Sequence, residues 1–151
     1  CNGGFTVEAA REHGFEAFGI ELDVVSLAYA QDHFPGNNYF HGRIEDYPVK
    51  NLFDVVYCSE VIEHVADVNG FLSAITRQMK RGALLYLTTP DISHWRTPKN
   101  INQWDALCPP AHCLYFNPSN MTRLLHRHGL RVLRKSWPWK PGIKLYARRA
   151  D

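Results

Sequence analysis

Three side chains that can bind a proton or a metal ion follow one apolar run in the middle of the chain. Glu60, Glu63 and His64 stand at positions i, i+3 and i+4 directly after Val55-Val56-Tyr57-Cys58. On a helix this spacing places all three on one face. Two carboxylates and an imidazole suit general acid–base chemistry, or a divalent ion such as Mg²⁺ or Mn²⁺. The stretch therefore predicts a functional site.

The apolar run that precedes these residues predicts where the site lies. Residues 55–57 are typical of a central parallel strand that is buried on both faces. Open α/β sheets bind their ligands at the carboxyl ends of such strands. We therefore expect the acidic cluster to project from the carboxyl end of a strand over residues 53–58.

A second candidate site lies at the start of the chain. The turn Cys1-Asn2-Gly3-Gly4 leads into a helix that Thr6 can cap, and a strand over residues 15–22 follows. Glu21, near the end of that strand, stands 17 residues beyond Gly4. Dinucleotide-binding folds place a ribose-binding carboxylate at about this offset of ~20 residues. A carboxylate accepts from both ribose hydroxyls, so Glu21 is predicted to bind a nucleoside.

Strands and helices alternate along most of the chain. We expect strands over residues 15–22, 39–41, 53–58, 83–88, 130–137 and 143–148, with helices after Gly4, Asp23, Asp67 and Asn117. The alternation predicts an α/β fold, a doubly wound, Rossmann-like and mostly parallel sheet with helices on both faces. The last two strands predict a C-terminal antiparallel hairpin. Residues 91–117 show no period, which favours a substrate-side loop within a single domain over residues 1–151.

Composition excludes several classes of protein. The 151 residues are 45% hydrophobic and 21% charged, with a formal net charge of +2, which gives no field for nonspecific nucleic-acid or membrane binding. No apolar run reaches the ~18 residues that span a bilayer, and no signal peptide is evident. The four cysteines lack the spacing of a disulfide scaffold, so a reducing, cytoplasmic setting is expected.

A cysteine-rich segment allows a different metal hypothesis. Cys108, His112 and Cys113 supply three potential zinc ligands within six residues, but no second ligand pair accompanies them. Four tryptophans can frame an aromatic substrate or pack in the core, namely Trp95, Trp104, Trp137 and Trp139.

Over nearly its whole length the chain resembles the class I methyltransferases that use S-adenosylmethionine, and in particular the quinone-biosynthesis O-methyltransferase group. The resemblance rests on five segments: Cys-Asn-Gly-Gly at 1–4, Gly-Ile-Glu at 19–21, Phe-Asp-Val-Val-Tyr-Cys-Ser-Glu-Val-Ile-Glu-His-Val at 53–65, Leu-Tyr-Leu-Thr-Thr-Pro at 85–90 and Pro-Pro-Ala-His-Cys-Leu-Tyr-Phe at 109–116. The block at 53–65 is the most specific of them. The resemblance implies methyl transfer from S-adenosylmethionine to a hydroxyl of a small molecule.

The resemblance also implies which residues bind the cofactor. Gly3, with Gly4 beside it in the turn, would line the methionine portion, and Glu21 would hold the ribose hydroxyls. The remaining implied contacts are Leu22 and Ile44 on the two faces of adenine, and Cys58 and Ser59 beside the sulfonium.

Two subsets of the family, the quinone-pathway catechol O-methyltransferases and the small-RNA 2′-O-methyltransferases, show a similar Glu-x-x-Glu-His. In this chain the resemblance implies a site for Mg²⁺ or another divalent metal, with the ligands Glu60, Glu63, His64 and the later His112. A bound divalent metal lowers the pKa of an acceptor hydroxyl. Without a metal, His64 or His112 can serve as the general base. The same residues can also simply cap a helix and form a local hydrogen-bond network.

The chain departs from the family pattern in two features, one residue and one strand. Arg43 stands where many relatives carry the aspartate that contacts the adenine amine. The family's first strand, which ends in an acidic residue before the glycine turn, has no counterpart here, so we expect a gap between the second and fourth family strands. An open edge of that kind favours pairing with another copy of the chain. Two other functions are alternatives to an active methyltransferase: a catalytically inactive cofactor-binding remnant and a nicotinamide-dependent oxidoreductase.

Overall fold

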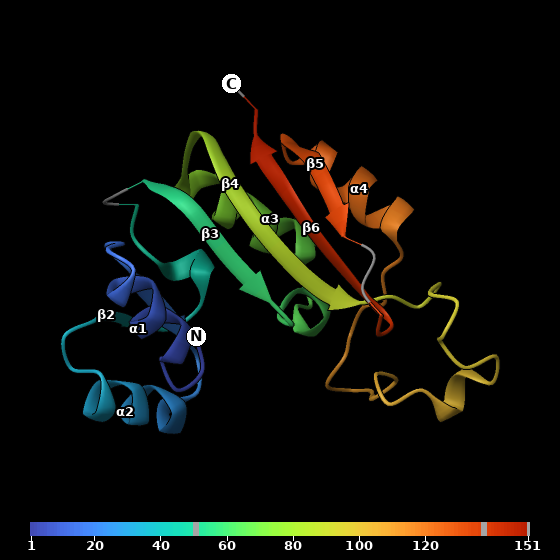
Figure 1. Ribbon diagram of the computed structural model, residues 1–151, viewed down its shortest axis with the longest axis horizontal. Helices are drawn as coiled ribbons and strands as arrows, with labels where there is room; N and C mark the ends of the chain where they lie inside the picture. The colour runs from blue at the N-terminus through green and yellow to red at the C-terminus, as the bar shows by residue number, and fades with distance from the viewer. Residues whose placement is uncertain (50–51, 137–138, 151) are drawn as a thin grey trace. The chain divides into compact units, whose positions relative to one another are not determined.

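The computed structural model describes residues 1–49, 52–136 and 139–150. The chain divides into two compact units, Cys1–Pro48 and Val49–Asp151 (Figure 1).

The first unit is a small α/β layer around one parallel strand pair. Its elements are α1 (Phe5–Glu12), β1 (Phe18–Glu21), α2 (Val24–His33), β2 (Asn38–His41) and the 3₁₀ turn η1 (Ile44–Asp46). β1 pairs with β2 in parallel, with Gly19 opposite Tyr39. Val7, Leu27 and Ala30 are its buried apolar side chains.

Helix starts in this unit follow the sequence prediction in one case and not in the other. The Asp23 carboxylate accepts from the Ser26 amide at 2.8 Å, so the predicted cap of α2 is confirmed. The predicted cap of α1 by Thr6 is wrong. This helix begins at Phe5, after Gly4 in the left-handed region at φ 83°, and it has no side-chain cap.

The second unit contains a four-stranded sheet in the order β3-β4-β6-β5. Its elements are β3 (Phe53–Ser59), the 3₁₀ turn η2 (Ile62–His64), α3 (Val68–Gln78), β4 (Met79–Pro90), the 3₁₀ turn η3 (Ile101–Gln103), α4 (Pro118–Arg127), β5 (Leu130–Ser136) and β6 (Gly142–Arg149). β3 and β4 run parallel, whereas β6 is antiparallel to both β4 and β5. The predicted C-terminal antiparallel hairpin is confirmed.

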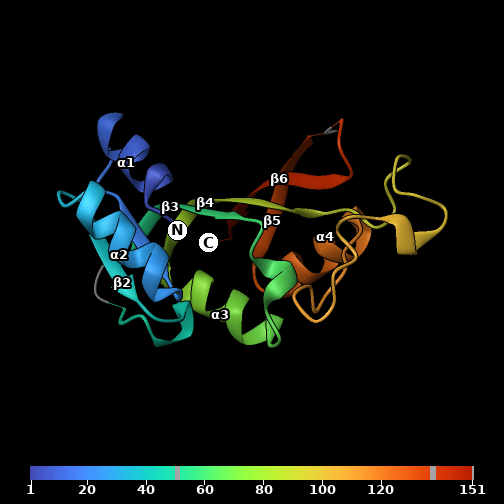
Figure 2. The same cartoon turned by 90° about the horizontal axis from the view of Figure 1, so that it is seen from below.

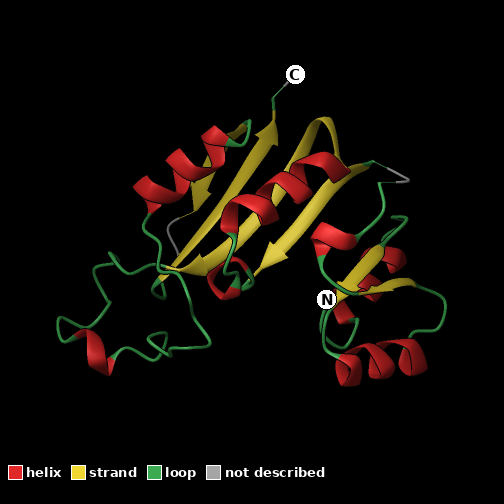
Figure 3. Ribbon diagram, turned by 180° about the vertical axis from the view of Figure 1, so that it is seen from behind, coloured by secondary structure: helices red, strands yellow, loops and turns green. Residues whose placement is uncertain are grey.

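Both helices of the second unit lie on the same face of this sheet (Figures 2 and 3). Along β4 the side chains alternate accordingly: Leu85 and Leu87 are fully buried, and Tyr86 between them is half-buried. The core of this unit therefore lies between the sheet and the α3–α4 layer.

The predicted burial of β3 on both faces is wrong for the second unit. Val55 and Tyr57 are 51% and 56% exposed, because β3 is the edge strand of its sheet and the helices of this unit cover only the opposite face. The described strands form two sheets, β1-β2 and β3-β4-β6-β5.

The predicted loop over residues 91–117 contains little regular structure. Its described elements are η3 and a single bridge between Asp91 and Phe116, which brings its two ends together. Trp104 and Phe116 are buried within it. None of the described helices is both long enough and apolar enough to span a membrane.

Candidate functional site

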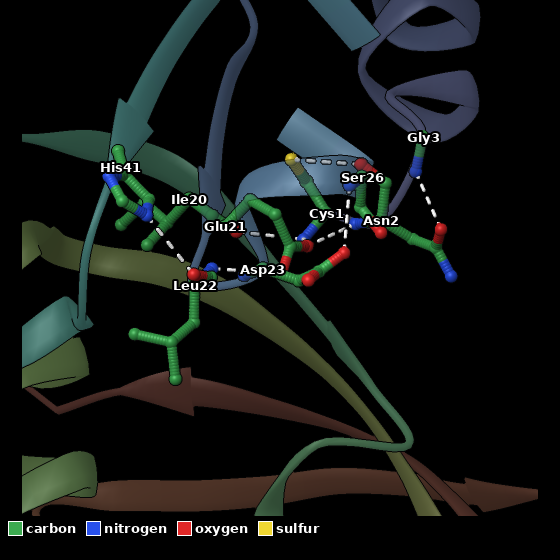
Figure 4. Close-up of polar contacts among 9 residues, drawn as sticks. All are labelled: Cys1, Asn2, Gly3, Ile20, Glu21, Leu22, Asp23, Ser26 and His41. Atoms are coloured by element: carbon green, nitrogen blue, oxygen red, sulfur yellow. Dashed lines mark hydrogen bonds and ion pairs between the residues drawn. The ribbon is translucent and has the colours of Figure 1, made fainter. Parts of the chain in front are cut away.

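In the first unit, Glu21 stands at the end of β1 and gathers donors from two sides (Figure 4). Its Oε1 accepts from the amides of Leu22 and Asp23 at 2.8 and 2.9 Å. Its Oε2 accepts from the Cys1 amino group at 2.8 Å and from the Asn2 amide. The carboxylate thus joins the strand end to the glycine turn.

These contacts keep the Glu21 carboxylate ionised. Burial acts to raise its pKa, but the hydrogen bonds from the Cys1 amino group, Asp23 and Asn2 outweigh burial and lower the pKa to about 2. An ionised carboxylate is the form that accepts from both hydroxyls of a ribose. The charge state of Glu21 therefore fits the predicted role.

The glycine turn has a structural reason of its own. A Cβ on Gly4 would lie 2.7 Å from the Tyr39 hydroxyl and 2.9 Å from the Ala30 Cβ, and its φ of 83° suits glycine. A Cβ on Gly3 would come within 3.0 Å of the Tyr29 ring. Packing within the unit thus accounts for Gly4.

The two predicted adenine contacts are also in the first unit. Leu22 is 65% exposed directly after β1, and Ile44 opens η1 and is half-buried. Arg43, which replaces the family's aspartate, forms an ion pair with Glu45 at 3.0 Å. The roles of Leu22 and Ile44 stay predictions.

In the second unit, the helix expected to carry the acidic cluster does not form. Glu60 has a φ of 51° in the left-handed region, and only the single 3₁₀ turn Ile62–His64 follows. The cause is the parallel neighbour of β3, because the Glu60 amide donates to the Thr88 carbonyl at 3.0 Å and prolongs the ladder by one residue. Glu60, Glu63 and His64 therefore do not share a helix face.

Two successive threonines at the end of β4 each hold one of the two carboxylates. Thr88 Oγ1 donates to Glu60 Oε1 at 2.7 Å, and Thr89 Oγ1 donates to Glu63 Oε2 at 2.9 Å. Successive residues of a strand point to opposite faces of the sheet. The carboxylates of Glu60 and Glu63 are therefore held by side chains that leave β4 in opposite directions.

Glu63 is a buried carboxyl group with one oxygen lacking a partner. The residue is 1% exposed, and among the described residues no donor contacts its Oε1. Burial is the main cause that raises the pKa of Glu63. A buried oxygen of this kind requires a proton or a cation.

The loop over residues 91–117 brings His112 to this carboxylate. The amides of Cys113 and Leu114 donate to the Glu63 carbonyl at 2.8 and 3.1 Å. The rings of His64 and His112 then meet edge to face, with centroids 4.6 Å apart.

Both histidines are oriented by backbone carbonyls. Nδ1 of His64 lies 2.8 Å from the Ala111 oxygen, and Nδ1 of His112 lies 2.7 Å from the Ala106 oxygen. Since a carbonyl oxygen only accepts, each Nδ1 carries the proton and each neutral ring presents the lone pair of Nε2. Metal-binding histidines are held in this manner.

Glu63, His64 and His112 together can hold a metal ion. Their ligand atoms lie within 4.8 Å of one another, and across the described residues this is the one such group of histidine, cysteine and acidic side chains. A carboxylate oxygen and two imidazole nitrogens suit a divalent cation. Glu60, the fourth predicted ligand, is outside this group.

Other predicted residues lie at the edges of the site. Cys58 is buried, and burial is the main cause that raises the pKa of its thiol to about 12. Ser59 contacts Thr88 through Oγ at 2.7 Å. The thiols of Cys108 and Cys113 are not part of the group that can hold a metal.

The tryptophans differ in their exposure to solvent. Trp104 is buried, whereas Trp95 and Trp139 are 64% and 73% exposed and stand edge to face with centroids 5.9 Å apart. Trp137 is outside the described residues.

Sequence reasoning missed the residues that orient the site. Thr88 and Thr89 stand in a segment predicted as a strand and its end, and a hydroxyl on each of two successive residues was the available signal. The carbonyls of Ala106 and Ala111 had no signal, because any residue supplies one.

The strand–helix alternation, the carboxylate at the end of β1 and the parallel β1-β2 and β3-β4 pairs define a Rossmann-like α/β domain. Residues 1–135 match the model of a family described as a methyltransferase domain, and the chain belongs to that family.

Relatives with curated names agree with this assignment. The chain is 24% identical over 155 residues to a ubiquinone biosynthesis O-methyltransferase of Nitrobacter winogradskyi, covering 90% of this chain and 56% of the relative. It is 27% identical over 130 residues to the enzyme of the same name from Rhodopseudomonas palustris, covering 74% of this chain and 51% of the relative. The chain thus spans about half the length of these relatives.

Solved structures share the fold. A magnesium protoporphyrin IX methyltransferase from Synechocystis with bound SAH has a TM-score of 0.77 at 16% identity, covering 99% of this chain and 71% of that one. An S-adenosylmethionine-dependent methyltransferase from Mesorhizobium loti has a TM-score of 0.79 at 18% identity, covering 99% of this chain and 88% of that one.

Proposed function

We propose that this chain is the cofactor-binding part of an S-adenosylmethionine-dependent methyltransferase that acts on a hydroxyl of a small molecule. Family membership and the fold support the methyltransferase part of the proposal. The names of the relatives from Nitrobacter and Rhodopseudomonas support transfer to oxygen. The group formed by Glu63, His64 and His112 is the observation on which the hydroxyl acceptor rests.

In this proposal Glu21 binds the ribose of S-adenosylmethionine. Its Oε1 is already held by the turn that follows β1, which fixes the orientation of the carboxylate. Its Oε2 is on the side of the glycine turn, where the present donors are the Cys1 amino group and the Asn2 amide. Gly3 and Gly4 would lie along the methionine portion, Leu22 and Ile44 along the adenine, and Cys58 and Ser59 near the sulfonium.

In this proposal the residues that carry out acid–base chemistry are in the second unit. A divalent cation bound by Glu63, His64 and His112 would lower the pKa of a coordinated acceptor hydroxyl. In the absence of a cation, the Nε2 lone pair of His64 or His112 can accept the hydroxyl proton. Because His112 is carried by residues 91–117, we propose this segment as the acceptor side of a single domain.

The same proposal includes an expected partner, compartment and oligomeric state. The expected partner is a small-molecule acceptor, and the cytoplasm is the expected compartment because the four cysteines lack the spacing of a disulfide scaffold. Pairing of two copies along the open edge of β3 also stays a prediction. The family match favours methyl transfer over nicotinamide-dependent oxidation.

Calorimetric titration with S-adenosylhomocysteine tests the cofactor part. We expect micromolar binding by the wild-type chain and a loss of about tenfold or more in Glu21→Gln, because two charge-assisted hydrogen bonds are weakened. Glu16→Gln, at an exposed glutamate of the same unit, is the matched control. A folded wild-type chain that does not bind S-adenosylhomocysteine would contradict the cofactor part of the proposal.

Glu63→Gln tests the metal part. The amide keeps the shape of the side chain but removes the negative charge, so Mn²⁺ binding measured by calorimetry should be lost. Unchanged Mn²⁺ binding would exclude Glu63 as a ligand.

A further inference from the structure

A cavity of about 340 Å³ lies in the second unit at the carboxyl end of β4. It is lined by three segments of the chain: Glu60, Thr88–Pro90 and Lys140–Lys144. Its volume is within the range of small-molecule sites. Its walls are the end of one parallel strand and the start of the antiparallel strand β6.

Glu60 adds a fixed negative charge to the cavity lining. Thr88 donates to Glu60 Oε1 at 2.7 Å, so the second short contact of Thr88, with Ser59 Oγ at 2.7 Å, must be a bond that Ser59 donates. This chain of hydroxyls holds the Glu60 carboxylate in place. The left-handed φ of Glu60, 51°, belongs to the same arrangement.

Two lysines, Lys140 and Lys144, add positive charge to the cavity lining. Neither Lys140 nor Lys144 forms an ion pair with a carboxylate in the part of the chain that the structure describes. The Lys144 ammonium lies 5.6 Å from the centroid of the Tyr86 ring. Next to Lys140 in the chain, Trp139 carries the Arg96 guanidinium at 4.6 Å from its ring centroid.

We propose that this cavity binds a small molecule with an anionic group, a carboxylate or a phosphate, which Lys140 and Lys144 hold. This anion site does not depend on the proposed methyl transfer.

Charge decides the class of ligand. Two ammonium groups without carboxylate partners favour an anion, and charge-assisted hydrogen bonds are the stronger kind. The Glu60 carboxylate repels a nearby anionic group. The acidic group of the ligand is therefore expected to contact the two lysines and not Glu60.

Two probes that differ only in charge test the inference. 3,4-Dihydroxybenzoate carries the carboxylate, and 3,4-dihydroxybenzamide is its neutral counterpart. Calorimetry on the wild-type chain should show about tenfold or more tighter binding of the acid than of the amide. 4-Hydroxyphenyl phosphate, compared with hydroquinone, shows in the same manner whether phosphate is the preferred anion.

The preference should disappear in the double variant Lys140→Gln, Lys144→Gln, with amide binding unchanged. Lys99→Gln is the matched control, because Lys99 is an exposed lysine outside the cavity lining. Equal binding of acid and amide by the wild type, or a preference that survives in the double variant, would overturn the inference. A preference abolished by the double variant, in a chain that binds no S-adenosylhomocysteine, would support the anion site and contradict the proposed function.

Discussion

Thr89 Oγ1 donates to Glu63 Oε2 at 2.9 Å, and both residues are 1% exposed. This bond makes the two oxygens of the buried Glu63 carboxyl group different. Oε2 accepts a hydrogen bond within the protein, whereas Oε1 has no donor among the described residues. Thr89 therefore determines which oxygen of Glu63 is available to a cation.

Replacing Thr89 tests that role. Thr89→Val keeps the shape of the side chain but removes the donor, so we expect Mn²⁺ binding to weaken by about 10–100-fold, as for other residues that orient a metal ligand. Thr89→Ser keeps the hydroxyl and should retain most of the affinity. Calorimetric titration with Mn²⁺ measures both variants, and equal affinities in Thr89→Val and the wild type would contradict an orienting role.

The pKa of Glu21 predicts a pH dependence of stability. Its value of about 2 in the folded chain is below the ordinary value of 4.5, so the folded state binds the Glu21 proton more weakly than the unfolded state. The stabilisation is therefore fully present above pH 4.5 and is lost as the pH falls from 4.5 towards 2. Urea midpoints between pH 6 and pH 3 should fall more steeply for the wild type than for Glu21→Gln.

Glu16→Gln is the control for that experiment, because Glu16 is exposed. Its urea midpoints should follow the wild-type slope. Parallel curves for the wild type and Glu21→Gln would show that the contacts of Glu21 contribute no stability.

Local sequence signals predicted much of this fold. Asp23, Asp67 and Asn117 each accept from the amide three residues later and start the helices predicted after them. Capping depends only on neighbouring residues, so the sequence is sufficient to locate it. The predicted hairpin of β5 and β6 is equally local.

The sequence predictions were wrong where the local structure depends on contacts with residues far away in the chain. Val55 and Tyr57 are apolar enough for a central strand, but their exposure depends on which element lies beside β3. Glu60 has helical spacing to Glu63, yet the Thr88 carbonyl 28 residues away extends the strand through it. Pairing of this kind is not encoded in the period of a short segment.

Burial predicts that the thiols differ in reactivity. Cys58 is 5% exposed and burial raises the pKa of its thiol to about 12, whereas Cys108 and Cys113 are exposed. Since the thiolate is the nucleophile, iodoacetamide at pH 8 should label Cys108 and Cys113 and leave Cys58 unmodified. Peptide mass spectrometry with and without urea measures this. Labelling of Cys58 in the folded chain at the rate of Cys108 would contradict its burial.

Asn117 connects residues 91–117 to α4, and its replacement tests the anchoring of that segment. Its Oδ1 accepts from the Asn120 amide at 2.8 Å, and its own amide donates to Asn120 Oδ1 at 2.9 Å. Asn117→Ala removes the first of these bonds, so the free energy of unfolding should fall by about 1 kcal/mol. Asn102→Ala, at an exposed position of the same segment, is the control and should change it by less than about 0.5 kcal/mol. α4 packs on β5, and His112 precedes the cap. A loss confined to stability, with Mn²⁺ binding retained, would show that the position of His112 is set by the hydrogen bonds from the Cys113 and Leu114 amides to Glu63. A parallel loss of Mn²⁺ binding would assign that role to the start of α4.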